Sequence, residues 1–101
     1  MVSLRVNGSQ VSPDDESAIA QQVNRRRDEG VPVCVQVRIE EGDLNMVLSS
    51  PQCTNGGGGG RPPNPREKRV FDLWDKLGLS GQSFAGGQVV AFLHQVQRLL
   101  P

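Results

Sequence analysis

Two cysteines are the side chains of this 101-residue chain best suited to covalent chemistry, and their surroundings decide what that chemistry could be. Cys53 stands just before a glycine run, so its sulfur would lie among backbone N–H groups, as in phosphate and oxyanion sites. A Cys-x5-Arg phosphatase loop would need arginine at position 59, which is glycine; the nearest arginine is Arg61. A nucleophilic cysteine usually needs a histidine base, and the only histidine, His94, lies in the other half of the chain. We therefore expect Cys53 to be a loop thiol, and we predict no catalytic residues.

Cys34 lies between two valines, on the polar phase of its predicted strand. A disulfide between Cys34 and Cys53 is geometrically possible if a second strand returns past Cys34. Without a secretory signal, however, the two cysteines favour reduced thiols over a disulfide. Two cysteines and one histidine also fall short of the four ligands of a structural zinc site, so we expect no metal.

The glycine-rich stretch at residues 53–63 is predicted to be a linker. A P-loop requires the pattern G-x-x-x-x-G-K-[ST], and no Gly-Lys pair occurs in the chain. Consecutive glycines lose much backbone entropy when they become ordered, and the following Pro62-Pro63 pair is stiffer. We therefore expect no cofactor, and a division into a sheet subdomain (1–52), a linker (53–63) and a two-helix segment (64–101).

Other polar and aromatic residues have structural explanations. His94 falls beside the apolar stripe of the last predicted helix, so we expect it at the surface. Trp74 and Phe71 share helical spacing with other apolar residues, which indicates the core rather than a ligand site. The arginines at 25–27 are followed at once by two acidic residues, which is typical of a solvated helix end.

The two C-terminal helices raise the alternative of DNA binding. A recognition helix needs basic and amide side chains near its N-terminal end. The last helix offers only Gln88 near its start and Arg98 near its end. The basic residues at 66–69 lie at the start of the preceding helix, which is the wrong place for groove reading, and the formal net charge of the chain is zero. Nucleic acid is therefore a disfavoured partner.

The element that must position these residues is a predicted β-hairpin over residues 31–50. Aliphatic and polar residues alternate from Val31 to Ile39, and the alternation resumes at Leu44 after a reversal at Glu41-Gly42. A period of two predicts strands with one aliphatic face. Because an isolated hairpin is only marginally stable in water, other elements must cover that face.

A shorter hairpin and a helix are predicted before it. Residues 2–6 and 9–11 flank Asn7-Gly8, the pair best suited to a type I′ turn. Ser12 is the expected cap of a helix from Pro13 to about Glu29, which Gly30 would terminate. Its apolar stripe is thin, so we place this helix at an edge of the sheet with much of its surface wet.

Two amphipathic helices are predicted after the linker. Asn64 and Glu67 form a capping signature for a helix that ends near Leu77, with Gly78 as its C-terminal cap. A second helix begins between residues 84 and 87 and ends near Leu100, with the cleanest apolar stripe in the chain.

The predicted fold class is α+β: an antiparallel sheet of three or four strands (hairpin, helix, hairpin), followed by the C-terminal helix pair. The preferred arrangement packs this pair on the sheet as one domain. In the alternative, residues 64–101 form a separate module that dimerises or binds a partner.

Three hypotheses for function remain open. The leading one is a small non-catalytic protein-interaction domain of unknown specific role, which would bind an unidentified protein partner or a second copy of itself. It rests on the lack of a catalytic constellation and on more apolar helix surface than two helices bury in each other. The alternatives are a thiol-dependent enzyme or redox function through Cys53, and nucleic-acid binding through the C-terminal helices.

The expected location is cytoplasmic, without a membrane partner. No apolar run approaches the roughly 18 residues that a membrane helix needs. The N-terminus also lacks the basic and apolar regions of a secretory signal.

Overall fold

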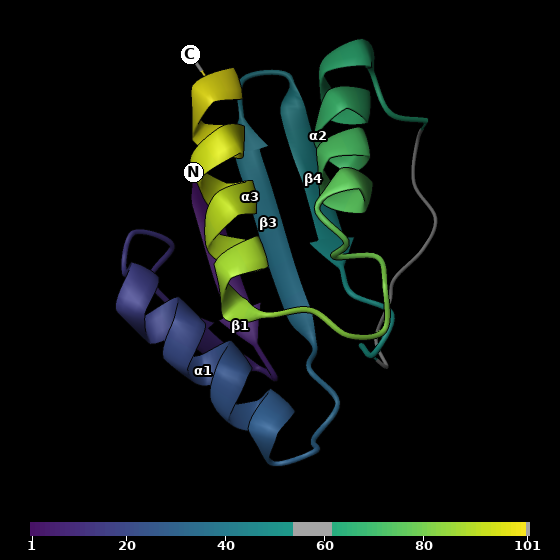
Figure 1. Cartoon of the computed structure of the whole chain (residues 1–101). Helices are drawn as coiled ribbons and strands as arrows, with labels where there is room; N and C mark the ends of the chain where they lie inside the picture. Colours follow the sequence, from purple (N-terminus) through teal and green to yellow (C-terminus); the bar gives the residue numbers. More distant parts are fainter. Residues whose placement is uncertain (54–61, 101) are drawn as a thin grey trace.

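The protein is described by a computed structural model that covers residues 1–53 and 62–100, and these form one four-stranded antiparallel sheet and three helices (Figure 1). The predicted α+β fold is confirmed. The sheet has the strand order β2-β1-β3-β4. The elements are β1 (Val2–Val6), β2 (Ser9–Val11), α1 (Glu16–Asp28), β3 (Val35–Glu41), β4 (Leu44–Ser49), α2 (Pro65–Lys76) and α3 (Gly86–Leu99). The predicted linker falls mainly on residues 54–61, outside the described part of the chain.

Both hairpins form, each around a positive-φ residue. Asn7 and Gly8 have φ of 48° and 85°, as the predicted type I′ turn requires. Gly42 has φ of 59° and joins β3 to β4, one residue later than the predicted reversal. The third strand begins at Val35 rather than at Val31. The Asn7 side chain explains this, because it accepts a hydrogen bond from Cys34 N and donates one to the Pro32 carbonyl in place of a regular ladder.

All three helices lie on one side of the sheet (Figure 1). The figure shows α2 along β4, and α1 crossing below α3. One apolar cluster joins the sheet to the helices; its large, completely buried members are Phe92, Leu4, Ile19, Ile39, Leu44, Leu79 and Leu93. The aliphatic face of the long hairpin is therefore covered by helices, as its pattern demanded. No helix in the described ranges is long and apolar enough to cross a membrane.

Helix α1 begins three residues later than predicted. Its cap is Asp15, whose carboxylate accepts a hydrogen bond from Ala18 N at 3.1 Å. Ser12, the predicted cap, instead begins a turn in which its carbonyl accepts a hydrogen bond from Asp15 N. Both residue types cap helices well, so the sequence around Pro13 offered two possible starts.

The start of α3 rests directly on α1, a helix that also contacts the sheet at β1 and keeps much of its surface exposed. A β-carbon on Gly86 would meet Ala20 Cα at 2.6 Å. Asn24 of α1 accepts a hydrogen bond from Gly86 N at 2.9 Å, so one helix caps the other. This external cap replaces the one that Ala85, the residue preceding α3, cannot supply.

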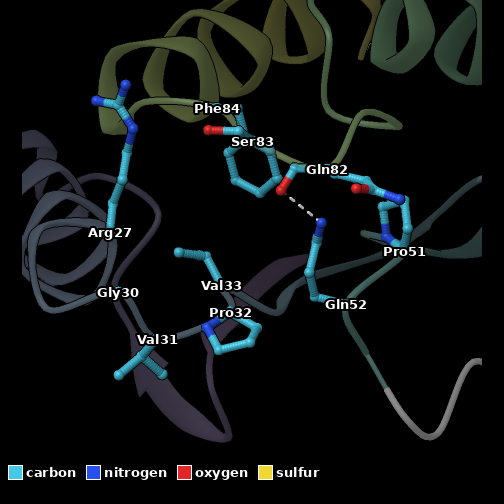
Figure 2. Close-up of a pocket in the computed structure, with 10 residues that line it drawn as sticks. All are labelled: Arg27, Gly30, Val31, Pro32, Val33, Pro51, Gln52, Gln82, Ser83 and Phe84. Atoms are coloured by element: carbon cyan, nitrogen blue, oxygen red, sulfur yellow. Dashed lines mark hydrogen bonds between the residues drawn. The ribbon is translucent and has the colours of Figure 1, made fainter.

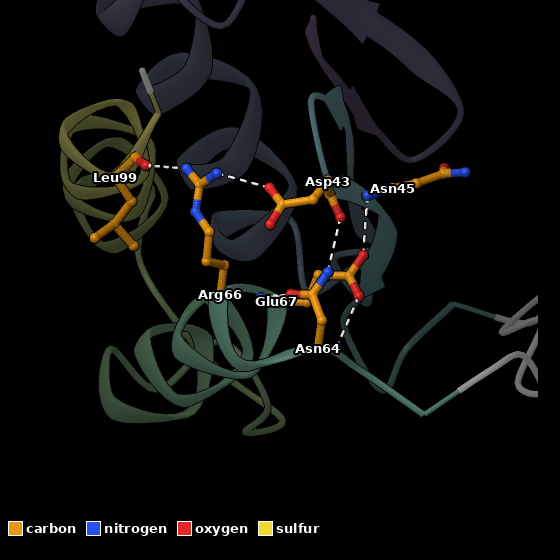
Figure 3. A network of polar contacts seen from close by, with 6 residues as sticks. All are labelled: Asp43, Asn45, Asn64, Arg66, Glu67 and Leu99. Atoms are coloured by element: carbon orange, nitrogen blue, oxygen red, sulfur yellow. Dashed lines mark hydrogen bonds and ion pairs between the residues drawn. The ribbon is translucent and has the colours of Figure 1, made fainter.

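The start of α2 has the predicted capping box. Glu67 N donates to Asn64 Oδ1, and Asn64 N donates to Glu67 Oε1. The other carboxylate oxygen of Glu67 accepts a hydrogen bond from Asn45 N of β4, so the cap also secures the helix to the sheet (Figure 3). The predicted end is confirmed as well: Gly78 has φ of 80°, and Leu79 folds back to donate to the Trp74 carbonyl.

Arg66 extends this network to the end of α3. Its guanidinium contacts the Asp43 carboxylate at 2.6 Å and donates to the Leu99 carbonyl at 2.8 Å (Figure 3). The Asn64 side chain donates to the Asp43 carbonyl. The β3–β4 turn and both C-terminal helices thus meet at one polar junction.

Candidate binding cleft

The two cysteines form a disulfide, Cys34–Cys53, so the expectation of free thiols is wrong for this structure. Strand β4 returns beside β3, and Ser50 then redirects the chain. Its hydroxyl accepts a hydrogen bond from Val35 N and donates one to the Val33 carbonyl. Cys53 N in turn donates to the Ser50 carbonyl, which brings Cys53 back to within 4.8 Å of Cys34, measured between Cα atoms.

The remaining sequence candidates take mostly structural positions. His94 is exposed, as expected, and its ring contacts the Glu16 carboxylate on α1. Arg25 forms an exposed ion pair with Glu29, which agrees with a solvated helix end. Gln88 uses both atoms of its amide within the fold: Oε1 accepts from Ala85 N, and Nε2 donates to the Leu77 carbonyl.

The two aromatic residues of α2 differ. Trp74 is buried and meets the Phe92 ring edge-on, with 5.1 Å between ring centroids. Phe71 is 37% exposed, so its predicted place in the core is wrong. Because α2 lies along β4, it buries only the narrow stripe of Glu67, Val70 and Trp74, and Phe71 falls beside that stripe.

No metal centre is built from the residues that the structure describes. Within residues 1–53 and 62–100 there is no group of three or more histidine, cysteine, aspartate or glutamate side chains that could hold an ion.

A cleft opens where four separate segments meet (Figure 2). Its volume is about 420 Å³, which lies in the range of small-ligand sites. The walls come from the end of α1, the segment before β3, the segment after β4, and the loop between α2 and α3. The lining residues are Arg27, Gly30, Val31, Pro32, Val33, Pro51, Gln52, Gln82, Ser83 and Phe84.

The cleft has an apolar floor. Phe84 and Val33 face each other across it in Figure 2, and both side chains belong to the buried core. Val31 at the rim is one of the few large apolar residues that the fold leaves exposed. The floor residues are themselves nearly covered, so the apolar surface that a ligand can reach lies mainly at the rim, at Val31.

Gln52 forms one wall and places polar atoms beside this floor. Its Nε2 donates to the Gln82 carbonyl at 2.6 Å, which ties the segment after β4 to the α2–α3 loop (Figure 2). Its Oε1 is buried and has no hydrogen-bond partner among the described residues. Gln52 also lines a second hollow, which includes both cysteines, so it stands between the cleft and the disulfide.

Among the residues that the structure describes, Arg27 is the only ionisable one that lines the cleft. Its neighbour Arg25 is paired with Glu29, whereas the Arg27 guanidinium makes no hydrogen bond or ion pair with another described residue. The cleft thus combines exposed apolar residues at its rim with an exposed arginine.

The uncovered face of the sheet holds a smaller hollow of about 270 Å³, lined by Ser3, Arg5, Gln36, Arg38 and Val47. One of its two cations, Arg38, is already paired with Glu40. No aromatic side chain lines this hollow, so it lacks the stacking platform of sheet-based RNA-binding domains.

No protein-family model matches the chain, and comparisons with curated proteins and with solved structures likewise find no match. The cleft residues were not identified from the sequence, because they come from four segments with no shared spacing. The exposed apolar residue at Val31 beside the helix-ending Gly30 is the one local signal that pointed here.

Proposed function

We propose that the chain is a small non-catalytic protein-interaction domain, and that the cleft beside the end of α1 is its docking site. The observation that carries this proposal is the exposed apolar surface of Val31, Pro32 and Pro51 beside the exposed Arg27, all of which line the cleft.

The surface on which this proposal rests differs from the one that the sequence indicated. The apolar stripe of α3, which the sequence offered as excess surface, is buried: Val89, Phe92, Leu93 and Val96 all belong to the core. The proposal therefore rests on the cleft and no longer on an unpartnered helix pair.

The two alternatives have weaker support. A thiol function through Cys53 would first require reduction of its bond to Cys34. Nucleic-acid binding through α3 would have to work without Gln88, whose amide is engaged in the fold. The cytoplasmic location stays a prediction, and the disulfide favours an oxidising compartment instead.

The test is a selection of random peptides displayed on phage against the full chain. Enriched peptides are then titrated into ¹⁵N-labelled protein, and we expect amide shifts around Val31, Gln52 and Phe84. Ser83→Trp places a bulky ring at the cleft and should abolish binding. Ser80→Trp changes an exposed residue that does not line the cleft, and should bind as the unmodified chain does.

Two outcomes would overturn the proposal. One is the absence of enriched peptides, and the other is shifts that map to the uncovered sheet face around Arg5 and Arg38. Light scattering identifies the second-copy alternative, because a dimer that is lost in Ser83→Trp would mean that the occupant is another copy of this chain.

A further inference from the structure

We propose that the Cys34–Cys53 disulfide is a redox switch for one wall of the cleft. In the oxidised chain the bond holds the segment from Pro51 to Cys53 in place, and reduction by a dithiol releases that segment. The effect on docking rests on the proposed function, whereas release of the segment can be measured without any ligand.

The fold holds the two cysteines unequally. Cys34 is fixed by the turn before it in the sheet: its N–H donates to Asn7 Oδ1 and its carbonyl accepts from Asn7 N, both at 2.8 Å. Cys53 follows Ser50, which is bound to the start of β3. Beyond Ser50 the described backbone folds back through one hydrogen bond, from Cys53 N to the Ser50 carbonyl at 3.1 Å. Reduction should therefore leave Cys34 in place and loosen Cys53.

Gln52 connects the disulfide to the cleft. It lines both the cleft and the hollow that contains the two cysteines. Its Nε2 donates to the Gln82 carbonyl at 2.6 Å, across the wall of the cleft (Figure 2). A movement of Cys53 is thus passed to the adjacent Gln52, and from there to the loop between α2 and α3.

The same glutamine supplies a driving force for release. Its Oε1 is buried and has no hydrogen-bond partner among the described residues. An acceptor in that position is unfavourable, because it has lost its bonds to water without replacing them. Once the segment detaches, this oxygen can bond to water. The disulfide therefore opposes a release that Gln52 Oε1 favours.

A reductant can reach the bond. Both cysteines are only partly buried, and they line an open hollow of about 420 Å³. A thiolate of the dithiol attacks one sulfur, forms a mixed disulfide and expels the other cysteine as a thiolate. The second thiolate of the reductant then displaces the first cysteine. Two electrons pass to the protein, the reductant becomes a cyclic disulfide, and the two cysteines take up the two protons that it lost.

The test is reduction of the ¹⁵N-labelled full chain with dithiothreitol under native conditions. Thiol labelling should count two free cysteines while circular dichroism shows that the helices are retained. We expect shifts of the Gln82 and Ser83 amides and of the Gln52 side-chain amide, and faster hydrogen exchange at Cys53 N. The Leu48 amide in β4 should not change. Gln82 and Ser83 are distant from both cysteines in the sequence, so their shifts report the wall and not the altered bond itself.

Variants assign the coupling to Gln52. A Cys34→Ser, Cys53→Ser double variant should show the loop shifts of the reduced chain with or without reductant. Gln52→Ala keeps the disulfide but removes the bond to Gln82, so reductant should no longer shift the loop amides. Gln36→Ala is the matched control, because Gln36 lines the disulfide hollow but not the cleft, and it should respond as the unmodified chain does.

Two outcomes would overturn the switch: a disulfide that dithiothreitol reduces only after the protein unfolds, and shifts confined to the cysteines and their sequence neighbours. Peptides enriched on the oxidised chain should bind the reduced chain about 2- to 10-fold more weakly, the cost of ordering one long side chain on binding. Equal affinity would mean that the bond does not regulate docking. If no peptide reaches the cleft, the proposed function fails, while loop shifts on reduction would still establish the switch.

Discussion

Gly86 lies so close to Ala20 that helices α1 and α3 touch through their backbones. A β-carbon built on Gly86 would stand 2.6 Å from Ala20 Cα and 3.0 Å from its carbonyl oxygen, and backbone atoms cannot move aside as a flexible side chain can. The glycine is therefore required by the contact and not by an unusual backbone angle. It fixes how closely the last helix approaches the first.

We expect Gly86→Ala to lower the free energy of unfolding by about 1–3 kcal/mol, which is typical of overpacking. The measurement is urea denaturation followed by circular dichroism. Gly87→Ala is the matched control, because a β-carbon there meets nothing within 4 Å and alanine favours the helix. Equal stability of the two variants would contradict the close contact.

The two aromatic residues of α2 should respond very differently to truncation. Trp74 is 4% exposed and meets Phe92, so Trp74→Ala should cost about 3–5 kcal/mol. Phe71 is exposed beside the buried stripe, so we expect Phe71→Ala to cost less than about 1 kcal/mol. Thermal unfolding measured by far-ultraviolet circular dichroism compares the two. A large loss of stability in Phe71→Ala would mean that this ring is covered in solution.

The junction at Glu67 should depend on its buried carboxylate more than on its exposed ion pair. Glu67 is 2% exposed and accepts hydrogen bonds from Asn45 N and Asn64 N. We expect Glu67→Ala to cost about 3 kcal/mol, since hydrogen bonds to charged groups contribute about 1.5–3 kcal/mol each. Asp43→Ala removes only the half-exposed pair with Arg66 and should cost less than about 1 kcal/mol. Urea denaturation ranks the two variants, and the reverse order would place the main energy in the ion pair.

The disulfide should stabilise the fold by lowering the conformational entropy of the unfolded chain. The cysteines are 19 residues apart, and a ring of this size is worth about 3 kcal/mol in the chain-entropy model. We expect reductant to lower the denaturation midpoint of the unmodified protein and to leave a Cys34→Ser, Cys53→Ser double variant unchanged. Thiol labelling before and after reduction counts the free cysteines. Two labelled thiols in oxidised, folded protein would contradict the bond.

The elements of the fold were readable from the sequence because each was specified locally. Alternation marked the long hairpin, Asn7-Gly8 marked a turn, and Asn64 with Glu67 marked a helix start. Where two local signals competed, as Ser12 and Asp15 did, no local pattern decided between them. Phe71 was misplaced because helical spacing does not reveal how much of a helix face the neighbouring strand covers.

Local sequence patterns could not reveal the candidate site. The disulfide depends on Ser50 turning the chain toward Cys34, and the cleft depends on the loop at residues 82–84 reaching the segment after β4. Such contacts between distant segments are set by tertiary packing. The lack of a secretory signal favours free thiols, whereas the geometry that pairs the cysteines is a tertiary feature.

The contact between the first and last helices also sets the order in which the chain can fold during synthesis. Asn24 and Gly86 are separated by 62 residues, so α1 is synthesised well before α3, the helix against which it packs. At roughly 5–20 residues per second this delay is about 3–12 seconds. During that interval α3 does not yet cover Ile19 and Val23, and the sheet is not yet covered by α2 and α3. Contacts of such long sequence separation are closed late and slowly. The newly made N-terminal half thus exposes apolar surface that only the later-made helices can cover.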